Sequence, residues 1–344
     1  MALSRLLPAS FEQPNPTNLV INGDQMVDQR NSGSALTASA SHQYATDRFI
    51  CRLGTSSSST IQQVSDAPDG FEKSMKLTIG TGASPSSSTG TGYFAHRIEG
   101  NNIAHLGWGS SGAKTVTLSF WVKSSVTGSF GVTLSNFDAS RSYPSSYTIS
   151  SANTWEYKTV TVSGDTSGTW KTDANSGIEM WFDWGNGSNF KGTANTWAGA
   201  DYRGGATGTV NICATSSATW QITGVVLNEG SYAISFPHES FAETLTKCHR
   251  YYHQLAIGTL YFNDLPNCAY IYRSFELPVK PRSSPAIAVV TQFQYWTGGS
   301  STNWTPTFGT SQDNLAFASV NVYGSSLTNG KGIHTGTLSV DAEL

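Results

Sequence analysis

Aromatic residues are dense between positions 155 and 202 of this 344-residue chain. Five of its ten tryptophans lie between Trp155 and Trp197. A sugar ring offers flat C–H patches and a rim of hydroxyls, so a site for one needs an exposed aromatic face beside polar groups. Strand alternation places Trp181 on one face between Glu179 and Asp183. These three residues are candidate sugar ligands, and the alternative is that Trp181 packs beneath a loop or against a neighbouring subunit.

The segment 185–205 is long for a hairpin connection and carries further candidates. It contains Trp197, Asp201 and Tyr202, and long loops on a rigid sandwich tend to carry function. Trp197 and Tyr202 are the best candidates for exposed stacking rings, with Asp201 as a polar partner. The alternative is a loop that only folds over the sheet.

The remaining aromatic candidates lie outside this loop. Trp121 points outward in the alternation of residues 115–123, whereas Trp184 shares a face with apolar neighbours and is expected in the core. Trp296 and Trp304 flank a turn at 297–303 that is rich in Gly, Ser and Asn, and they form a rival site. The alternative for this pair is a solvent-exposed hairpin with structural aromatics.

The carboxylates do not favour catalysis. Glycoside hydrolysis needs two carboxyl groups at a fixed separation across a cleft. Glu179 and Asp183 are four residues apart on one strand, about 13 Å, which is too far for either usual geometry. Asp201 could supply a partner only if its loop folded back. No GxSxG elbow, Walker loop or dinucleotide fingerprint occurs, so we expect a binding protein rather than an enzyme.

Histidine and cysteine patterns are also weak signals of chemistry. His249 and His253 have the spacing that puts two imidazoles on one helix face, but no HExxH pattern accompanies them, which favours a solvated or subunit-packing face. The cysteines are scattered without a CxxC pair, which favours free buried thiols. They are Cys51, Cys213, Cys248 and Cys268.

Composition excludes two classes of partner. The net charge is −3 with no basic stripe, so nothing indicates nucleic-acid binding. No apolar run is long enough to span a bilayer, and the first residues lack the apolar core of a signal peptide. We therefore expect synthesis in a cytoplasm and no membrane insertion. Only 12% of residues are charged while 12% are aromatic, which is typical of a folded chain of strands and tight turns.

Short alternating strands must position these residues. The segments 115–123, 129–135, 178–184 and 219–228 each present one apolar face, and a phase change at Gly224 indicates a bulge. Repeated alternation of this kind predicts two antiparallel sheets packed together.

The sequence pattern changes near residue 236. Ser240 and Glu243 form a capping box that begins a helix at about 240–254. Prolines and further strand candidates at 287–296, 315–323 and 333–340 follow. The expected fold is all-β, a jelly-roll β-sandwich followed by a short helix and a second, smaller β-sandwich domain. The expected parts are an N-terminal arm (1–16), a jelly roll (17–236), a helical junction (237–255) and a C-terminal β domain (256–344).

Several segments carry a family resemblance. NLVINGDQMVDQR (18–30), ATDRF (45–49), TLSFWVKSS (117–125), TWEYKTVTVSGDTSGTW (154–170) and ITGVVLNEGS (222–231) resemble jelly-roll carbohydrate-binding modules, above all a module of bacteriophage tail fibres. ETLTKCHRYYHQ (243–254) and ELPVKPRSSP (276–285) look like the segment that joins such a module to a fibre tip. The resemblance makes Trp155 and Trp170 framework residues.

The resemblance implies a virion protein of the phage tail, assembled in the bacterial cytoplasm. Its partners would be a host cell-surface polysaccharide or lipopolysaccharide, two further copies of itself in a homotrimer, and a tail or capsid protein bound through the arm. A structural virion protein, either a capsid decoration or a tail adaptor, is one alternative. A glycan depolymerase is the second.

The resemblance also raises a structural calcium ion. Related modules often hold one between an acidic residue after the first strand and an aspartate in the closing strand. Asp24 and Asp28 could serve at the first place, but the closing strand offers Gly224 and no carboxylate. Calcium takes six to eight oxygen ligands, several of them charged, so calcium is an open expectation and no other cofactor is expected.

Overall fold

The structure is a computed structural model, and it describes residues 17–344 apart from 57, 258–259, 262–270, 292, 297–300, 305–306, 312–318, 325–331 and 335. The expected arm, residues 1–16, lies outside the described residues, and so does Cys268. None of the described helices combines the length and apolar character needed to cross a membrane. Antiparallel strands dominate the described chain, which confirms the all-β prediction.

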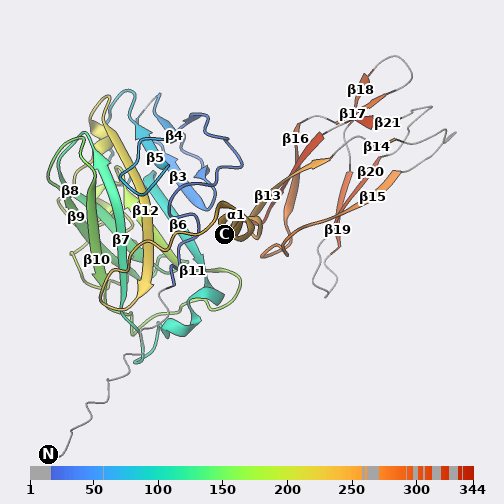
Figure 1. Ribbon diagram of the computed structural model, residues 1–344. Helices are drawn as coiled ribbons and strands as arrows, with labels where there is room; N and C mark the ends of the chain where they lie inside the picture. The colour runs from blue at the N-terminus through green and yellow to red at the C-terminus, as the bar shows by residue number, and fades with distance from the viewer. Residues whose placement is uncertain are drawn as a thin grey trace, which may run out of the picture.

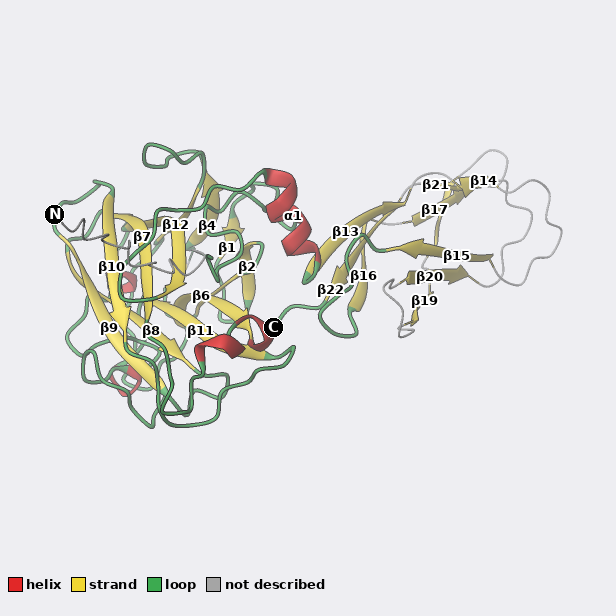
Figure 2. Ribbon diagram, turned by 60° about the horizontal axis from the view of Figure 1, so that its bottom comes forward, coloured by secondary structure: helices red, strands yellow, loops and turns green. Residues whose placement is uncertain are grey.

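Two antiparallel sheets pack face to face, each with six strands among the described residues (Figure 2). Sheet A has the order β1 (Leu36–Thr37), β4 (Thr60–Val64), β5 (Ser74–Thr78), β12 (Thr219–Glu229), β7 (Val116–Ser124), β10 (Glu156–Val162). Sheet B has the order β2 (Gln43–Thr46), β3 (Phe49–Leu53), β6 (Gly92–Glu99), β11 (Ser176–Asp183), β8 (Gly128–Ser135), β9 (Ser142–Ile149). Short 3₁₀ helices lie in the connections: η1 (Gly100–Asn102), η2 (Ala104–Leu106), η3 (Ser188–Phe190) and η4 (Ile212–Ala214). This is the predicted jelly-roll sandwich.

Aromatic side chains fill the space between the sheets. Phe94 and Trp184 stack with ring centroids 5.7 Å apart, and Trp220 meets them edge-on at 5.9 and 5.7 Å. Both tryptophans are fully buried, which confirms the predicted core position of Trp184. The indole N–H of Trp220 donates to the Tyr147 hydroxyl at 3.0 Å, so this polar atom keeps a partner inside the core.

The predicted bulge in the closing strand is present. The register between β12 and β7 shifts between Thr223 and Val226, and Gly224 has a φ of 62°. A Cβ at Gly224 would lie 2.7 Å from Phe71 and 3.1 Å from Trp121. Glycine therefore serves both the left-handed backbone and the close approach of two rings over it.

Helix α1 (Phe241–His249) begins as predicted and ends early. Glu243 N–H donates to Ser240 Oγ at 3.3 Å, and the Ser240 N–H donates to the Glu243 carboxylate at 2.8 Å, which is the predicted capping box. The prediction of a helix to 254 is wrong, because β13 begins at Tyr252 and pairs with the chain's last strand. His253 lies on this strand rather than on the helix, and its ring centroid is 4.2 Å from that of His249.

The remaining strands lie beyond α1, away from the jelly roll (Figure 1). They pair as β13 (Tyr252–Ile257), β22 (Gly336–Asp341), β16 (Ala286–Thr291); as β14 (Leu260–Tyr261), β21 (Gly332–His334), β17 (Phe293–Trp296), β18 (Ser301–Trp304); and as β15 (Ile271–Glu276), β20 (Ser319–Gly324), β19 (Thr307–Ser311). The single strands predicted at 287–296 and 333–340 are each two strands. The cysteines among the described residues are free and buried, as predicted.

Candidate functional site

Trp181 lies on the outer face of sheet B, as its strand position predicts, but its ring is not exposed. Only 2% of the residue is accessible. Its indole N–H donates to Ser135 Oγ at 2.9 Å, Tyr93 packs edge-on with centroids 4.7 Å apart, and the Arg203 guanidinium lies 4.9 Å from the ring centroid. The prediction of an exposed platform at Trp181 is therefore wrong, and the alternative of packing beneath a loop holds.

Glu179 and Asp183 flank Trp181 on the same face, yet neither carboxylate is free. Glu179 is buried, with an oxygen 2.9 Å from Arg97 Nε. Burial raises the pKa of Glu179 to about 7, against the opposing effect of Arg97 and Arg203. Asp183 accepts two backbone N–H groups at 2.8 and 3.1 Å and the Lys191 ammonium at 2.7 Å. The expected role of these residues as hydroxyl acceptors is contradicted, because both are buried and internal partners hold Asp183.

The loop residues predicted to stack on sugar also pack inward. Trp197 is half-buried against the core, its indole N–H donates to the Ser163 carbonyl at 2.8 Å, and its ring meets Trp170 edge-on with centroids 5.6 Å apart. Asp201 forms an ion pair with Arg203, and the half-buried Tyr202 ring lies against the backbone at Gly192. The loop folds over sheet B, which is the alternative stated for it. Trp170 is buried, as expected of a framework residue.

Trp121 keeps the outward position predicted for it and lies beside an exposed ring. It pairs across strands with Tyr157 on β10, and their ring centroids are 5.4 Å apart with planes tilted by 53°. Tyr157 is 43% exposed. Sequence reasoning missed Tyr157, although its alternation with Val160 and Val162 gives the outward direction, because the pairing of β10 with β7 joins distant segments.

Charged and amide groups border these rings. Asp66 accepts hydrogen bonds from Lys123, from Gln221 Nε2 at 3.2 Å and from the Trp155 indole at 3.4 Å. The Lys123 ammonium lies 5.0 Å from the centroid of the Trp155 ring. Trp155, expected as framework, is half-buried on this outer face rather than in the core between the sheets.

We call this surface of sheet A the aromatic platform. Burial opposes ionisation of Asp66, but the hydrogen bonds from Lys123 and Gln221 outweigh it and lower its pKa, so the carboxylate is charged at neutral pH. The Asp66 side chain is 49% exposed. An exposed ring beside an accessible carboxylate can stack on C–H groups and accept hydrogen bonds from hydroxyls. The platform consists of Trp121, Trp155, Tyr157, Asp66, Lys123 and Gln221.

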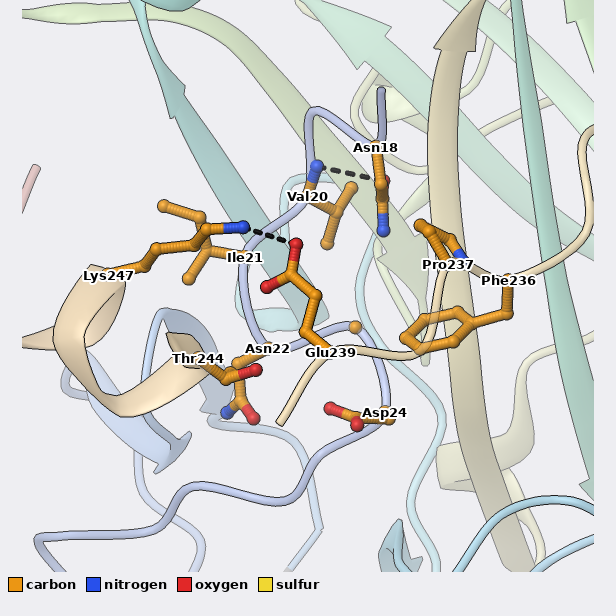
Figure 3. Close-up of a pocket in the computed structure, with 11 residues that line it drawn as sticks. Asn18, Val20, Ile21, Asn22, Asp24, Phe236, Pro237, Glu239, Thr244 and Lys247 are labelled. Atoms are coloured by element: carbon orange, nitrogen blue, oxygen red, sulfur yellow. Dashed lines mark hydrogen bonds and ion pairs between the residues drawn. The ribbon is translucent and has the colours of Figure 1, made fainter. Parts of the chain in front are cut away.

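The residues suggested for calcium do not form a ligand set. Asp28 accepts the backbone N–H groups of Asn31 at 3.0 Å and of Gly33 at 2.9 Å. Asp24 lines a cavity of about 30 Å³ whose Glu239 turns its carboxylate toward Lys247 (Figure 3). Within the described part of the chain, no group of three His, Cys, Asp or Glu residues could hold a metal ion. The structural calcium near Asp24 and Asp28 stays a prediction.

The rival aromatic pair lies at a hairpin of the C-terminal strands. Trp296 ends β17 and pairs with Ser301, while Trp304 ends β18 and pairs with Phe293. The tip of the turn, residues 297–300, lies outside the described residues. This rival site stays a prediction.

Comparison with known proteins gives weak likenesses. No protein-family model matches the chain, and no curated protein matches it. One similar structure is the enzymatically active domain of tailspike protein 4 from bacteriophage CBA120, at 14% identity and a TM-score of 0.33, over 62% of this chain and 21% of that one. The chain thus spans about a fifth of that tailspike domain.

Two other similar structures are bacterial. The CBM22-1–GH10 modules of a Clostridium thermocellum endo-1,4-beta-D-xylanase, complexed with xylohexaose, match at 12% identity and a TM-score of 0.30, over 60% of this chain and 31% of that one. The CBM22-1 xylan-binding domain from Paenibacillus barcinonensis matches at 7% identity and a TM-score of 0.26, over 58% of this chain and all of that one. These likenesses are low, and the sandwich is established by its own strand pairing.

Proposed function

We propose that this chain is a non-catalytic carbohydrate-binding protein and that the aromatic platform is its binding surface. The observation that carries the proposal is the exposed Tyr157 ring beside Trp121, with the Asp66 carboxylate on the same outer face. The aromatic rings predicted from the sequence on sheet B are covered, whereas Tyr157 is open to solvent. Flat rings bordered by charged and amide groups suit the alternating C–H and hydroxyl surface of a sugar.

Removing the exposed ring is the direct test. Tyr157→Ala should weaken binding on a glycan array about fivefold or more, because stacking on a half-exposed ring contributes about 1 kcal/mol. Tyr157→Phe keeps the ring and should bind nearly as the wild type does. Tyr232→Ala is the matched control, since Tyr232 is 84% exposed and is not part of the platform. Equal binding by wild type and Tyr157→Ala to every glycan that the wild type binds would overturn the proposal that the platform is the binding surface.

The same proposal extends to the setting of the protein. The resemblance of residues 18–30 and 243–254 to phage tail-fibre segments supports a virion protein that attaches the particle to host-surface polysaccharide or lipopolysaccharide. Such a protein would be a homotrimer docked to a tail or capsid protein through residues 1–16. Light scattering should then give about 110 kDa, three times 36.8 kDa. A monomer would count heavily against the fibre.

Two other functions make different predictions. A structural virion protein would bury the platform against another virion protein, and glycan binding would be absent. A depolymerase would release new reducing ends from a bound polysaccharide. Glu179 and Asp183 are both buried, and the Asp183 carboxylate is held by Lys191 and two backbone N–H groups, which argues against that chemistry on sheet B.

A further inference from the structure

Arginine side chains converge on the outer face of sheet B, on the opposite side of the sandwich from the aromatic platform. Arg97 lies on β6 beside Glu179, and the Arg203 guanidinium covers the ring of Trp181. Their side chains remain 18% and 23% exposed, although Arg97 Nε itself is buried. Packing a guanidinium over an indole holds it in place. Nε and Nη2 of Arg203 donate to the Asp201 carboxylate, which leaves the Nη1 side of the group for a ligand.

A third arginine and a histidine complete this surface. Arg52 on β3 pairs across strands with Tyr93, whose hydroxyl is 2.8 Å from His42 Nε2. His42 is exposed, and its pKa is lowered by burial of the ring and then by Arg97, Arg52 and Arg203. The positive potential of all three arginines therefore reaches one point on this face. We call Arg52, Arg97, Arg203 and His42 the arginine face.

The positive charge on this face exceeds the negative charge beside it. Glu179 partners Arg97, and Asp201 partners Arg203. Arg52 donates to the Ala40 carbonyl, and no ion pair of Arg52 is found within the described ranges. Because burial raises the pKa of Glu179 to about 7, part of even this compensation is absent near neutral pH.

We propose that the arginine face binds the carboxylates of an acidic saccharide. The binding groups are Arg52 and the Nη1 side of Arg203, because Nε and Nη2 of Arg203 already donate to Asp201. Arg97, held by Glu179 and by the Leu344 carbonyl, adds positive charge beside them. Planar guanidinium groups pair with carboxylates in a two-bond geometry that neutral sugars cannot reproduce. Arg52 lies beside Tyr93 across the β3–β6 pairing. Tyr93 and Arg97 are four residues apart on β6, about 13 Å. This spacing suits several charges along a chain rather than one small anion.

The anion site stands on its own geometry, while its assignment to a saccharide rests on the proposed function. The two sites are on different sheets, so their failures can be told apart. Tyr157→Ala should leave binding at the arginine face unchanged, and Arg52→Gln should leave neutral-sugar binding at the platform unchanged. Inorganic phosphate and a neutral oligosaccharide separate a general anion site from one built for sugar carboxylates.

The test is calorimetric titration of the full chain with an oligogalacturonide, its neutral galactose counterpart and inorganic phosphate. The wild type should bind the oligogalacturonide, bind phosphate weakly, and lose affinity as salt rises from about 50 to 500 mM. Arg52→Gln and Arg203→Gln should each weaken it about tenfold or more, and Arg203→Lys should restore part of the affinity. Circular dichroism establishes whether each variant is folded. If Arg203→Gln does not fold, the comparison of Arg52→Gln with Arg52→Lys replaces it.

Three results would overturn the proposal. The first is wild-type protein that binds no oligogalacturonide. The second is equal affinity for the oligogalacturonide and its neutral counterpart. The third is unchanged oligogalacturonide binding by folded Arg52→Gln and Arg203→Gln.

Discussion

Glu179 shows how a single buried residue can make stability depend on pH. Its ordinary pKa is 4.5, and burial raises the folded-state pKa to about 7 although Arg97 and Arg203 oppose the rise. A carboxyl group with a raised folded-state pKa is most favourable when protonated. The free energy of unfolding is therefore highest below about pH 4.5 for this group and falls as pH rises to about 7.

Glu179→Gln should remove this dependence. Of the pKa gap, the part that titrates between pH 5 and pH 8 corresponds to roughly 2–3 kcal/mol, so the variant should gain that much stability relative to wild type over this range. Urea unfolding gives the change in the free energy of unfolding between pH 5 and pH 8 for wild type and for the variant. Subtracting one change from the other cancels the other titrating groups. Parallel stability profiles for wild type and variant would show that Glu179 does not titrate in this range.

At the scale of strands, local pattern predicted the faces and the bulge but not what covers them. The outward direction of Trp181 follows from the two-residue period of β11, and the core position of Trp184 follows from the same period. The cover supplied by Arg203 depends on the path of a long loop and on the reach of one side chain. Neither is encoded in the two-residue period of a strand, so the pattern could not predict that the ring of Trp181 is covered.

The same limit of local pattern explains why the contact between Tyr157 and Trp121 was not predicted. Tyr157 becomes a neighbour of Trp121, which lies 36 positions earlier in the chain, only through the pairing of β10 with β7. Strand register between distant segments is set by the whole sheet. Sequence alternation could place each ring on an outer face, but it could not bring the two rings together.

The bulge in β12 offers a test at this scale, because Gly224 supports the platform from beneath. In Gly224→Ala, the backbone at φ 62° is strained and the new Cβ would lie 2.7 Å from Phe71. We expect a loss of about 2–3 kcal/mol in the free energy of unfolding, together with weaker glycan binding, since Trp121 would also move.

Gly208→Ala is the matched control for that substitution. Gly208 has a φ of 86°, and nothing lies within 4 Å of the place that its Cβ would occupy, so it reports the backbone cost alone, about 1 kcal/mol. Denaturant melts of both variants give the steric share by subtraction. Equal losses would mean that the contact with Phe71 relaxes freely.

At the scale of the whole molecule, charged residues join the jelly roll to the C-terminal strands. Arg48 is fully buried on the jelly roll, lies 3.5 Å from the centroid of the Tyr251 ring, and pairs with Glu343 at the end of the chain. Arg282 donates to the carbonyls of Ala342 and of Ala174, one from each side of the junction. Figure 1 places the C-terminus between the two groups of strands. The junction therefore holds the two parts in one arrangement.

Breaking the buried pair should loosen that arrangement. Glu343→Gln leaves the Arg48 charge buried without its carboxylate, and removing one partner of a buried ion pair costs about 3–5 kcal/mol. We expect faster proteolysis between the jelly roll and the C-terminal strands, while glycan binding at the platform persists. Lys247→Met is the matched control, since the Lys247–Glu239 pair is exposed and contributes about 0–1 kcal/mol. Equal cleavage rates for wild type, Glu343→Gln and Lys247→Met would mean that other contacts across the junction, such as Arg282 with the Ala174 carbonyl and Arg250 with Glu99, hold it closed without the ion pair.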